Sequence, residues 1–177
     1  MREGNSLIRR LPALACLLLT GCGYGLVGRT SSLPPDIEEI YIQPLSNRTL
    51  REQIDQEFTR AITNEFLRRP RFKIVNSLDE ADAVLVGEVS SFQVRAVLFG
   101  VEDEGRAREY EIMVLAKMEF RRSGTDEVIW QQPFYQFREN YTFDLEPTSF
   151  TDQQDVAVLE VADEFAETLV IDILEGF

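Results

Sequence analysis

The segment from residue 109 to residue 121 alternates between apolar and charged side chains more regularly than any other part of the sequence. One set of alternate positions carries Tyr110, Ile112, Val114, Ala116, Met118 and Phe120, and the other carries Glu109, Glu111, Lys117, Glu119 and Arg121. Because successive side chains of a strand point to opposite faces of a sheet, this pattern predicts a strand with one buried face and one wet face. The chain is therefore expected to fold around a sheet that other elements cover on one side.

Two further strands are predicted on either side of this one. A long strand is expected over residues 83–98, and its second half alternates Phe92, Val94, Ala96 and Leu98 with more polar neighbours. Turn residues at 123–126 lead into a third strand over residues 127–141, so the three strands should form an antiparallel meander. Residues 37–43 predict a separate first strand, and residues 72–75 predict a short extended piece.

Pro133 lies inside the third strand of this meander. Proline has no backbone N–H to donate, so it is confined to edge strands and bulges. Because a sheet edge is a place where another chain can add a strand, Pro133, Phe134 and Tyr135 form a candidate partner-binding edge. The alternative is an edge that the proline merely protects from such pairing.

A first helix is predicted between Thr49 and Pro70. Its apolar positions at helical spacing are Leu50, Ile54, Phe58, Ala61 or Ile62, and Phe66. Thr49 and Glu52 are spaced as a capping box at the start, and Pro70 stops the run. Arg68 and Arg69 suit the negative end of the helix dipole, and a phosphate-binding role is the alternative for them.

A second helix of about 24 residues is predicted near the C-terminus. Its wide apolar stripe consists of Val158, Leu159, Ala162, Phe165, Ala166, Leu169 and Ile173. Thr151 and Gln154 are spaced as its capping box, and its stripe is interpreted as core, with a membrane-surface or partner helix as the alternative. The element order of strand, helix, three strands and helix predicts an α+β fold: a two-layer sandwich, with two helices packed on a mainly antiparallel sheet of about four strands.

The first residues have the organisation of an export signal. Arg2, Arg9 and Arg10 precede an apolar run from Leu11 to Leu19, which is far shorter than the ~20 residues needed to span a bilayer. Leu19-Thr20-Gly21-Cys22 then resembles the lipobox of bacterial lipoproteins. Cys22 is therefore the predicted attachment point of acyl chains such as palmitate, and two or three chains hold a protein at a membrane almost permanently. The alternative is an ordinary small-residue cleavage site that happens to contain a cysteine.

The expected organisation is a lipoprotein signal peptide over residues 1–21, a lipidated tether over 22–35 and one folded domain over 36–177. Cys22 is the one cysteine that remains after the signal is removed, so no disulfide is expected. Removal of three basic residues and one acidic residue changes 18 basic and 31 acidic residues into 15 and 30, a net charge of −15. Such a surface repels phosphate backbones, and no nucleic acid partner is expected.

The sequence carries no pattern that is typical of an active site. It contains no histidine, and no glycine-rich phosphate loop or serine elbow follows a predicted strand. The acidic clusters at residues 79–82 and 102–104 lack the ligand spacing of a calcium loop. We therefore expect no catalysis and no metal or cofactor site.

Five short motifs, taken in order, resemble the lipopolysaccharide-assembly lipoprotein family, LptE. They are Cys22-Gly23-Tyr24, Asn47-Arg48-Thr49, Ala81-Asp82-Ala83-Val84-Leu85-Val86-Gly87, Glu109-Tyr110 and Trp130. The resemblance implies two helices on a four-stranded sheet and a lipoprotein of the outer membrane, anchored at its periplasmic face. It also implies a protein that lies partly inside the β-barrel of LptD, assists assembly of that barrel and helps to pass lipopolysaccharide to the cell surface. Gly23 fits this location, because an aspartate after the cysteine is the usual retention signal for the inner membrane.

The loop over residues 99–108 departs from the family pattern. Family members that contact lipopolysaccharide directly use basic residues in loops at one end of the sheet, whereas the first half of this loop is acidic. Arg95, Arg106 and Arg108 are the candidate lipopolysaccharide contacts, and salt bridges to neighbouring acids are the alternative for Arg106 and Arg108. Two other functions stay open. One is a periplasmic lipoprotein that carries an amphiphilic ligand between helix and sheet, and the other is an acidic adaptor that binds envelope proteins through the strand with Pro133.

Overall fold

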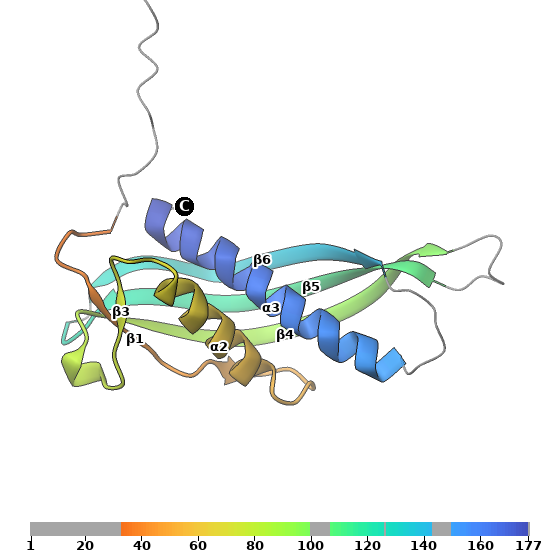
Figure 1. The fold of residues 1–177 in the computed structure, drawn as a ribbon, viewed down its shortest axis with the longest axis horizontal. Coiled ribbons are helices and arrows are strands. Elements are labelled where there is room, and N and C mark those ends of the chain that lie inside the picture. Colours follow the sequence, from red (N-terminus) through yellow and green to blue (C-terminus); the bar gives the residue numbers. More distant parts are fainter. Residues whose placement is uncertain (1–32, 100–106, 126, 143–149, 177) are drawn as a thin grey trace, which may run out of the picture. The chain divides into compact units, whose positions relative to one another are not determined.

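A computed structural model describes residues 33–99, 107–125, 127–142 and 150–176 of the chain. Its elements, shown in Figure 1, are β1 (Glu39–Ile42), β2 (Ser46–Asn47), α2 (Ile54–Leu67), β3 (Lys73–Ile74), the 3₁₀ turn η1 (Leu78–Glu80), β4 (Ala83–Phe99), β5 (Ala107–Arg122), β6 (Val128–Thr142) and α3 (Phe150–Glu175). The predicted order of strand, helix, three strands and helix is confirmed. The predicted α+β architecture follows from this order.

The strands form one mixed sheet with the order β3-β1-β4-β5-β6, and β2 pairs separately with β4. β4, β5 and β6 are antiparallel neighbours, as the alternating pattern predicted, whereas β1 and β2 run parallel to β4. The sheet has six strands where about four were predicted. The difference lies in β2 and β3, which have two residues each and are too short to carry a period-2 pattern. β3 falls within the short extended piece predicted over residues 72–75, which was not counted as a strand of the sheet.

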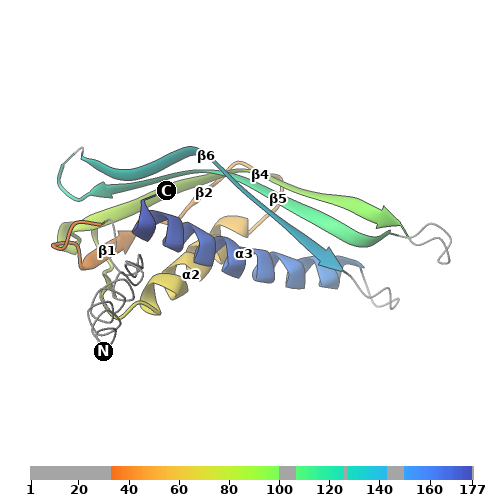
Figure 2. The same cartoon turned by 90° about the horizontal axis from the view of Figure 1, so that it is seen from above.

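Both helices lie on the same face of the sheet, so the molecule has two layers (Figure 2). Aromatic side chains hold these layers together: the ring centroids of Phe58 on α2 and Phe165 on α3 are 4.9 Å apart, and those of Phe165 and Tyr135 on β6 are 5.4 Å apart. Phe66 on α2 stacks on Phe120 of β5. Each buried aromatic ring of this kind removes a large apolar area from water, which is the main source of stability in a domain without disulfides.

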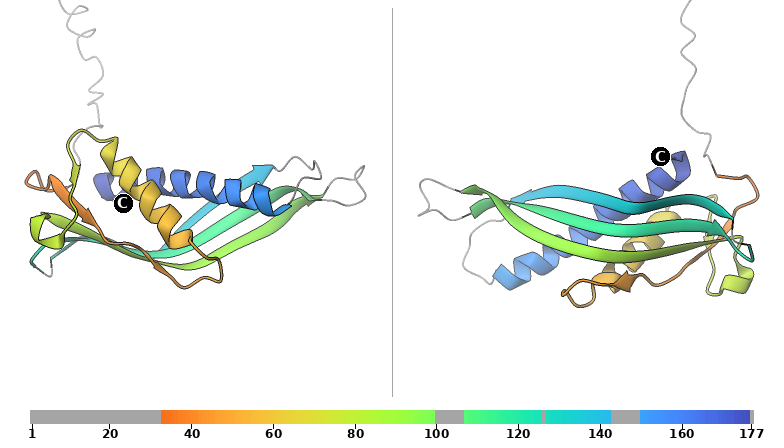
Figure 3. Two further views of the ribbon diagram at one scale, coloured as in Figure 1. Left: turned by 60° about the horizontal axis from the view of Figure 1, so that its bottom comes forward. Right: turned by 180° about the vertical axis from the view of Figure 1, so that it is seen from behind.

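The opposite face of β4, β5 and β6 is not covered by any helix of the described chain (Figure 3). The alternation within β5 explains this asymmetry, because Ile112, Val114, Ala116, Met118 and Phe120 are all buried under the helices. Glu111, Lys117 and Glu119, at the intervening positions, stay at the surface. The prediction of one buried face and one wet face is confirmed.

The predicted start of the first helix is wrong. α2 begins at Ile54 rather than after Thr49, and its N-cap is Gln53, which has a positive φ of 63° and no capping side chain. The hydroxyl of Thr49 instead accepts a hydrogen bond from the backbone N–H of Arg51 at 3.2 Å, within the loop that precedes the helix. Leu50, which was assigned to the apolar stripe, is fully exposed on that loop. The spacing of a capping box does not show whether the hydroxyl has another partner, and here a backbone N–H of the loop binds it in place of the helix.

The end of α2 shows what the two arginines before Pro70 do. Arg68 Nη1 lies 3.0 Å from one oxygen of Glu65, and Arg69 Nη2 lies 2.6 Å from the other. Glu65 is only 5% exposed and is the one buried charged residue of the described chain. Because a buried carboxylate is costly without partners, both arginines neutralise an internal charge.

α3 follows the predicted stripe closely. It begins at Phe150, one residue before the expected cap, and the side chains of the proposed capping pair Thr151 and Gln154 lie outside the described residues. Its buried residues are Ala157, Val158, Val161, Ala162, Phe165, Ala166, Leu169, Val170 and Ile173. Leu159 is exposed instead of buried, because it lies at the border of the stripe. Neither helix of the described chain is both long and apolar enough to cross a bilayer.

Candidate functional site

Some of the candidate residues from the sequence lie in the described part of the structure, and others lie outside it. Cys22 and Arg106 lie outside the described residues, and so does the side chain of Arg108, whose backbone belongs to β5. Arg95 lies on β4 and is exposed on the face of the sheet that the helices leave uncovered. That face therefore carries the candidate contact that the structure describes.

Arg95, Glu111 and Arg138 form a cluster across three adjacent strands, which we call the arginine cluster. Arg95 of β4 is directly opposite Glu111 of β5 in the sheet register and donates to its carboxylate. Arg138 of β6 approaches the other carboxylate oxygen, with 3.6 Å between Nε and Oε2. The side chain of Glu111 is 13% exposed, whereas both arginines are about half exposed. One carboxylate thus holds two guanidinium groups at the surface.

The arginine cluster has a net charge of +1 on a chain whose formal charge is −13. A guanidinium group offers several N–H donors in a plane, which suits phosphate and carboxylate oxygens better than an ammonium group does. Glu111 fixes the two arginines by its ion pairs and leaves their outer N–H groups toward solvent. Arg138 Nη2 also contacts the sulfur of Met113, at 3.8 Å. The arrangement can bind an anion that reaches the open face of the sheet.

Arg138 was not found from the sequence. The buried neighbour Phe137 places it on the wetter face of its strand, and that much is visible in the alternation. Its proximity to Arg95 depends on the pairing of Met113 with Arg138 and of Glu111 with Arg95. A register between strands is not written in either strand alone, so only the structure brings the two arginines together.

Pro133, Phe134 and Tyr135, the candidate partner-binding residues, lie on β6, which is an edge strand of the sheet. Between the pairs Ala116–Tyr135 and Met118–Gln132, β6 has one residue more than β5, so Pro133 and Phe134 form a bulge. The prediction that Pro133 marks an edge or a bulge is confirmed, since it marks both. Phe134 is 79% exposed, and Tyr135 points the other way, into the core.

Two tyrosines connect β6 to α3. The hydroxyl of Tyr135 donates to Asp172 Oδ2 at 2.8 Å, and that of Tyr141 donates to Glu164 Oε2 at 2.8 Å. Burial, followed by the hydrogen bond to the carboxylate, raises the pKa of each tyrosine well above its usual range. Both hydroxyls therefore remain protonated and donate hydrogen bonds. Tyr135 contributes to the packing of α3 against the sheet, and its side chain is not presented to an outside partner.

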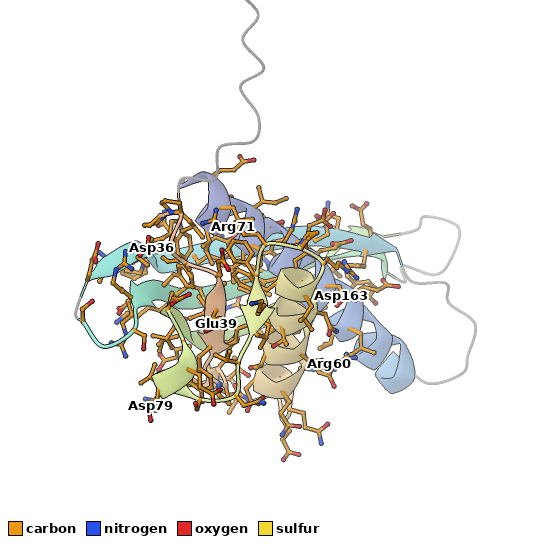
Figure 4. The ribbon with its side chains drawn as sticks, turned by 60° about the vertical axis from the view of Figure 1, so that its left-hand side comes forward. Asp36, Glu39, Arg60, Arg71, Asp79 and Asp163 are labelled. Atoms are coloured by element: carbon orange, nitrogen blue, oxygen red, sulfur yellow. The ribbon has the colours of Figure 1, made fainter. Side chains whose placement is uncertain are left out.

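At the other end of the sheet, Asp82 holds the start of β1. Its Oδ2 accepts from the backbone N–H groups of Glu39 and Glu38 at 2.9 and 3.0 Å, and these bonds lower the pKa of the carboxyl. Nearby, Asp36 pairs with Arg122 at 2.6 Å; Figure 4 views the molecule from this end, with Asp36 and Glu39 labelled. Asp82 thus has a structural partner, and the described residues include no group of three side chains that could hold a metal ion.

The sequence matches the model of the LptE family, described as lipopolysaccharide-assembly, over residues 37–173. The chain therefore belongs to the LptE family, and the family predicted from the five motifs is confirmed. No curated protein matches the sequence.

Several solved structures are similar. Rare lipoprotein B from Shewanella oneidensis is 21% identical, with a TM-score of 0.42 over 78% of this chain and 92% of that chain. The hypothetical protein CT253 from Chlamydia trachomatis is 12% identical, with a TM-score of 0.49 over 80% and 97%. An uncharacterized lipoprotein B from Nitrosomonas europaea is 18% identical, with a TM-score of 0.42 over 87% and 89%.

Proposed function

We propose that this chain is a lipoprotein of the outer membrane, anchored at the periplasmic face through acyl chains on Cys22, that forms a complex with an LptD-type β-barrel. In this complex it supports assembly of the barrel and the transport of lipopolysaccharide to the cell surface. The observation that carries the proposal is the family match over residues 37–173. The fold contributes a rigid body, with buried aromatic rings between two layers, that can be held inside or against a barrel.

The first test is purification of the tagged full-length chain from membranes in mild detergent. A large β-barrel protein should be recovered with it in a stable ratio, and mass spectrometry of the mature amino terminus should show acylated Cys22. The Cys22→Ala variant is the control: it should lack the acyl mass and should no longer fractionate with the outer membrane. Recovery of the acylated chain as a monomer without a barrel would remove the proposal.

We further propose that the arginine cluster, together with Arg106 and Arg108, contacts the phosphates of lipopolysaccharide. Support comes from the geometry, since Arg95 and Arg138 present two guanidinium groups on the uncovered face of the sheet. Each of the two arginines already pairs with Glu111. The phosphates of lipopolysaccharide would therefore accept hydrogen bonds from the guanidinium N–H groups that these ion pairs do not use. The acidic charge of the whole chain opposes such binding at long range, so the contact is expected to be local and sensitive to salt.

Binding of purified lipopolysaccharide to the detergent-purified chain tests this contact. The double variant Arg95→Gln, Arg138→Gln should bind at least about thirtyfold more weakly, because each lost charged hydrogen bond is worth roughly 1 kcal/mol or more and the two together are worth at least about 2 kcal/mol. Arg60→Gln on α2 is the matched control, since Arg60 is also exposed and ion-paired, to Glu57, and lies on the helical layer. Equal weakening by control and double variant would exclude the cluster. Loss of binding on chelation of divalent cations would instead indicate a cation bridge to acidic side chains.

The alternative of an amphiphile carried between helix and sheet has less support. The interface between these layers is filled by side chains that are fully buried, among them Phe58, Phe120 and Phe165. A ligand there would have to displace packed aromatic rings. Extraction of a lipid from the pure chain in the absence of a barrel would favour the carrier.

We also propose that the chain has no catalytic activity, because its candidate sites are ion pairs on the uncovered face of the sheet.

A further inference from the structure

Lys117 of β5 is exposed on the face of the sheet that the helices leave uncovered, and no carboxylate of the described residues pairs with it. Its neighbour on β4 in the sheet register is Glu88, but the carboxylate of Glu88 pairs with Arg48 at 3.0 Å. Glu119, two residues further along β5, lies 3.7 Å from Arg121. Both neighbouring carboxylates thus have arginine partners, and the charge of Lys117 is left for a ligand.

An exposed aromatic ring lies opposite Lys117 on the other neighbouring strand. The bulge of β6, at Pro133 and Phe134, faces the single position of Lys117 on β5. The side chain of Phe134 is 79% exposed, and its ring packs on no other ring of the described chain. The surface therefore presents an aromatic ring beside a cation that has no partner among the described residues.

Two glutamines of β6, Gln131 and Gln136, flank this bulge and are exposed on the same face of the sheet. The amide nitrogen of Gln136 lies 3.2 Å from the sulfur of Met113, so its carbonyl oxygen is not used in that contact. A side-chain amide can both donate and accept hydrogen bonds. We call these four residues the lysine patch: Lys117, Gln131, Phe134 and Gln136.

The chemistry of the lysine patch fits a sugar that carries a negative charge. The C–H groups on one side of a sugar ring pack on the face of an aromatic ring, and its hydroxyl groups exchange hydrogen bonds with amides. An ammonium group binds a phosphate as a compact charge. The patch supplies one aromatic ring, two amides and one ammonium group, which are the groups that such a ligand requires.

The charge around the lysine patch is positive, although the chain as a whole is acidic. The three cations Lys117, Arg48 and Arg121 and the two carboxylates of Glu88 and Glu119 sum to +1. The acidic residues are concentrated instead on α3, which contains eight of them and no lysine or arginine. Because α3 lies on the other face of the sheet, an anion meets the least repulsion on the uncovered face.

Other occupants fit the lysine patch less well. An acyl chain needs a continuous apolar surface, whereas Phe134 lies beside a lysine and two amides. An added strand needs regularly spaced main-chain groups, which Pro133 and the bulge interrupt. A second copy of this chain would bring together two domains with a formal charge of −13 each.

We propose that the lysine patch binds a phosphorylated sugar of the lipopolysaccharide core. Phe134 packs on the sugar ring, Gln131 and Gln136 bind its hydroxyl groups, and Lys117 binds its phosphate. The proposal rests on the proposed function, because lipopolysaccharide is the source of the sugar. Lys117 and Glu111 are six residues apart on β5, about 20 Å along the strand, so the lysine patch and the arginine cluster contact different parts of the ligand.

Calorimetric titration of the full-length lipoprotein in detergent tests the lysine patch. The probes are the phosphorylated core oligosaccharide released from lipopolysaccharide, the same oligosaccharide after dephosphorylation, and lipid A. The wild-type chain should bind the phosphorylated probe at least about tenfold more tightly than the dephosphorylated one, because the phosphate adds a charged hydrogen bond. Equal binding of the two oligosaccharides, or no binding of either, would overturn the proposal. So would binding of lipid A that Lys117→Gln weakens, because the phosphate at Lys117 would then belong to lipid A.

Two variants separate the phosphate from the sugar ring. Lys117→Gln should weaken binding of the phosphorylated probe at least about tenfold and leave the dephosphorylated probe unchanged. Phe134→Leu should weaken both probes about fivefold, because leucine lacks the flat ring. Both side chains are exposed, so neither variant should lower the melting temperature. Lys73→Gln, at an exposed lysine of β3, is the matched charge control and should change nothing. An equal loss with Lys73→Gln would reduce the effect to net charge and overturn the site.

The outcomes also separate this site from the proposed function. If the barrel is recovered with the chain and the arginine cluster binds lipopolysaccharide, but no variant of the lysine patch alters binding of the oligosaccharide, the lysine patch is not a sugar site and the proposed function stands. If the chain recovers no barrel and binds no lipopolysaccharide, both fail.

Discussion

The two ends of β4 differ in the strands that pair with them and in the elements that cover them. At the end that begins with Ala83, β1, β2 and β3 complete the sheet, Asp82 holds β1 in place and α2 covers the inner face. Beyond Val89, β5 is the one described strand that pairs with it. The first end, the closed end, is built for stability. The second, the open end, presents main chain and the arginine cluster. Substitutions at the two ends should therefore have very different effects on folding.

The largest effect is expected where the two layers meet. Phe165 of α3 contacts Phe58, Tyr135 and Phe137, with ring centroids 4.9 to 5.9 Å apart, and it is fully buried. Phe165→Ala removes all three contacts and leaves a cavity, so the free energy of unfolding in urea should fall by about 3–5 kcal/mol. A fall of less than about 1 kcal/mol would mean that the layers do not depend on this ring.

Gly87, in the closed end of β4, should show the next largest effect. A Cβ at this position would lie 2.5 Å from Leu45 Cδ2 and 2.6 Å from Met118 Sδ. Both neighbours are flexible side chains, so Gly87→Ala should force them aside and cost about 1–3 kcal/mol, measured by thermal unfolding. Ser90→Ala, three residues further along the strand, is the comparison: it loses only the exposed hydrogen bond from the Ser90 hydroxyl to Leu115 O at 3.0 Å and should cost less than about 1 kcal/mol. Equal losses at the two positions would contradict the difference between the ends.

Asp82→Ala removes the acceptor of two backbone N–H groups at the start of β1, and it should cost about 1–2 kcal/mol at neutral pH. Because the folded-state pKa of Asp82 is lowered, its charge contributes stability above the unfolded value of about 4. That contribution is lost as the pH falls through the folded pKa. The difference in melting temperature between wild type and Asp82→Asn should therefore shrink below about pH 4. A difference that is constant from pH 7 to pH 3 would show that the charge is irrelevant.

The smallest effects are expected in the arginine cluster. Surface ion pairs contribute little to folding, so Arg95→Gln or Arg138→Gln should change the free energy of unfolding by less than about 1 kcal/mol. The same substitutions are the ones expected to weaken lipopolysaccharide binding. A cost comparable to that of Phe165→Ala would mean that the open end is a structural element after all.

The sequence predicted those parts of the fold that repeat along one segment. The alternation in β5 and the stripe of α3 both reflect burial on one face, and a buried face is visible in a single stretch of residues. The start of α2 was missed because Thr49 and Glu52 have the spacing of a cap, while the loop that uses the Thr49 hydroxyl is invisible in that spacing. Local rules fail where a neighbouring segment offers the same atom a better partner.

The candidate sites divide in the same way. Pro133 could be assigned to an edge or bulge because a missing N–H has the same consequence in any sheet. The arginine cluster could not be predicted, since it depends on the pairing of Glu111 with Arg95 and on the position of Arg138 two strands away from β4. The point along β4 at which its second neighbouring strand ends could not be predicted either, because β2 ends at Asn47 and a two-residue strand leaves no periodic pattern in the sequence.

Trp130 is the only tryptophan of the chain. It lies buried on β6, with its ring centre 6.1 Å from that of Tyr135, the residue whose hydroxyl is bonded to α3. The protein consequently contains its own optical probe at the junction between the terminal helix and the outermost strand. A red shift in indole emission would report the detachment of that helix, so its release could be timed without any attached dye.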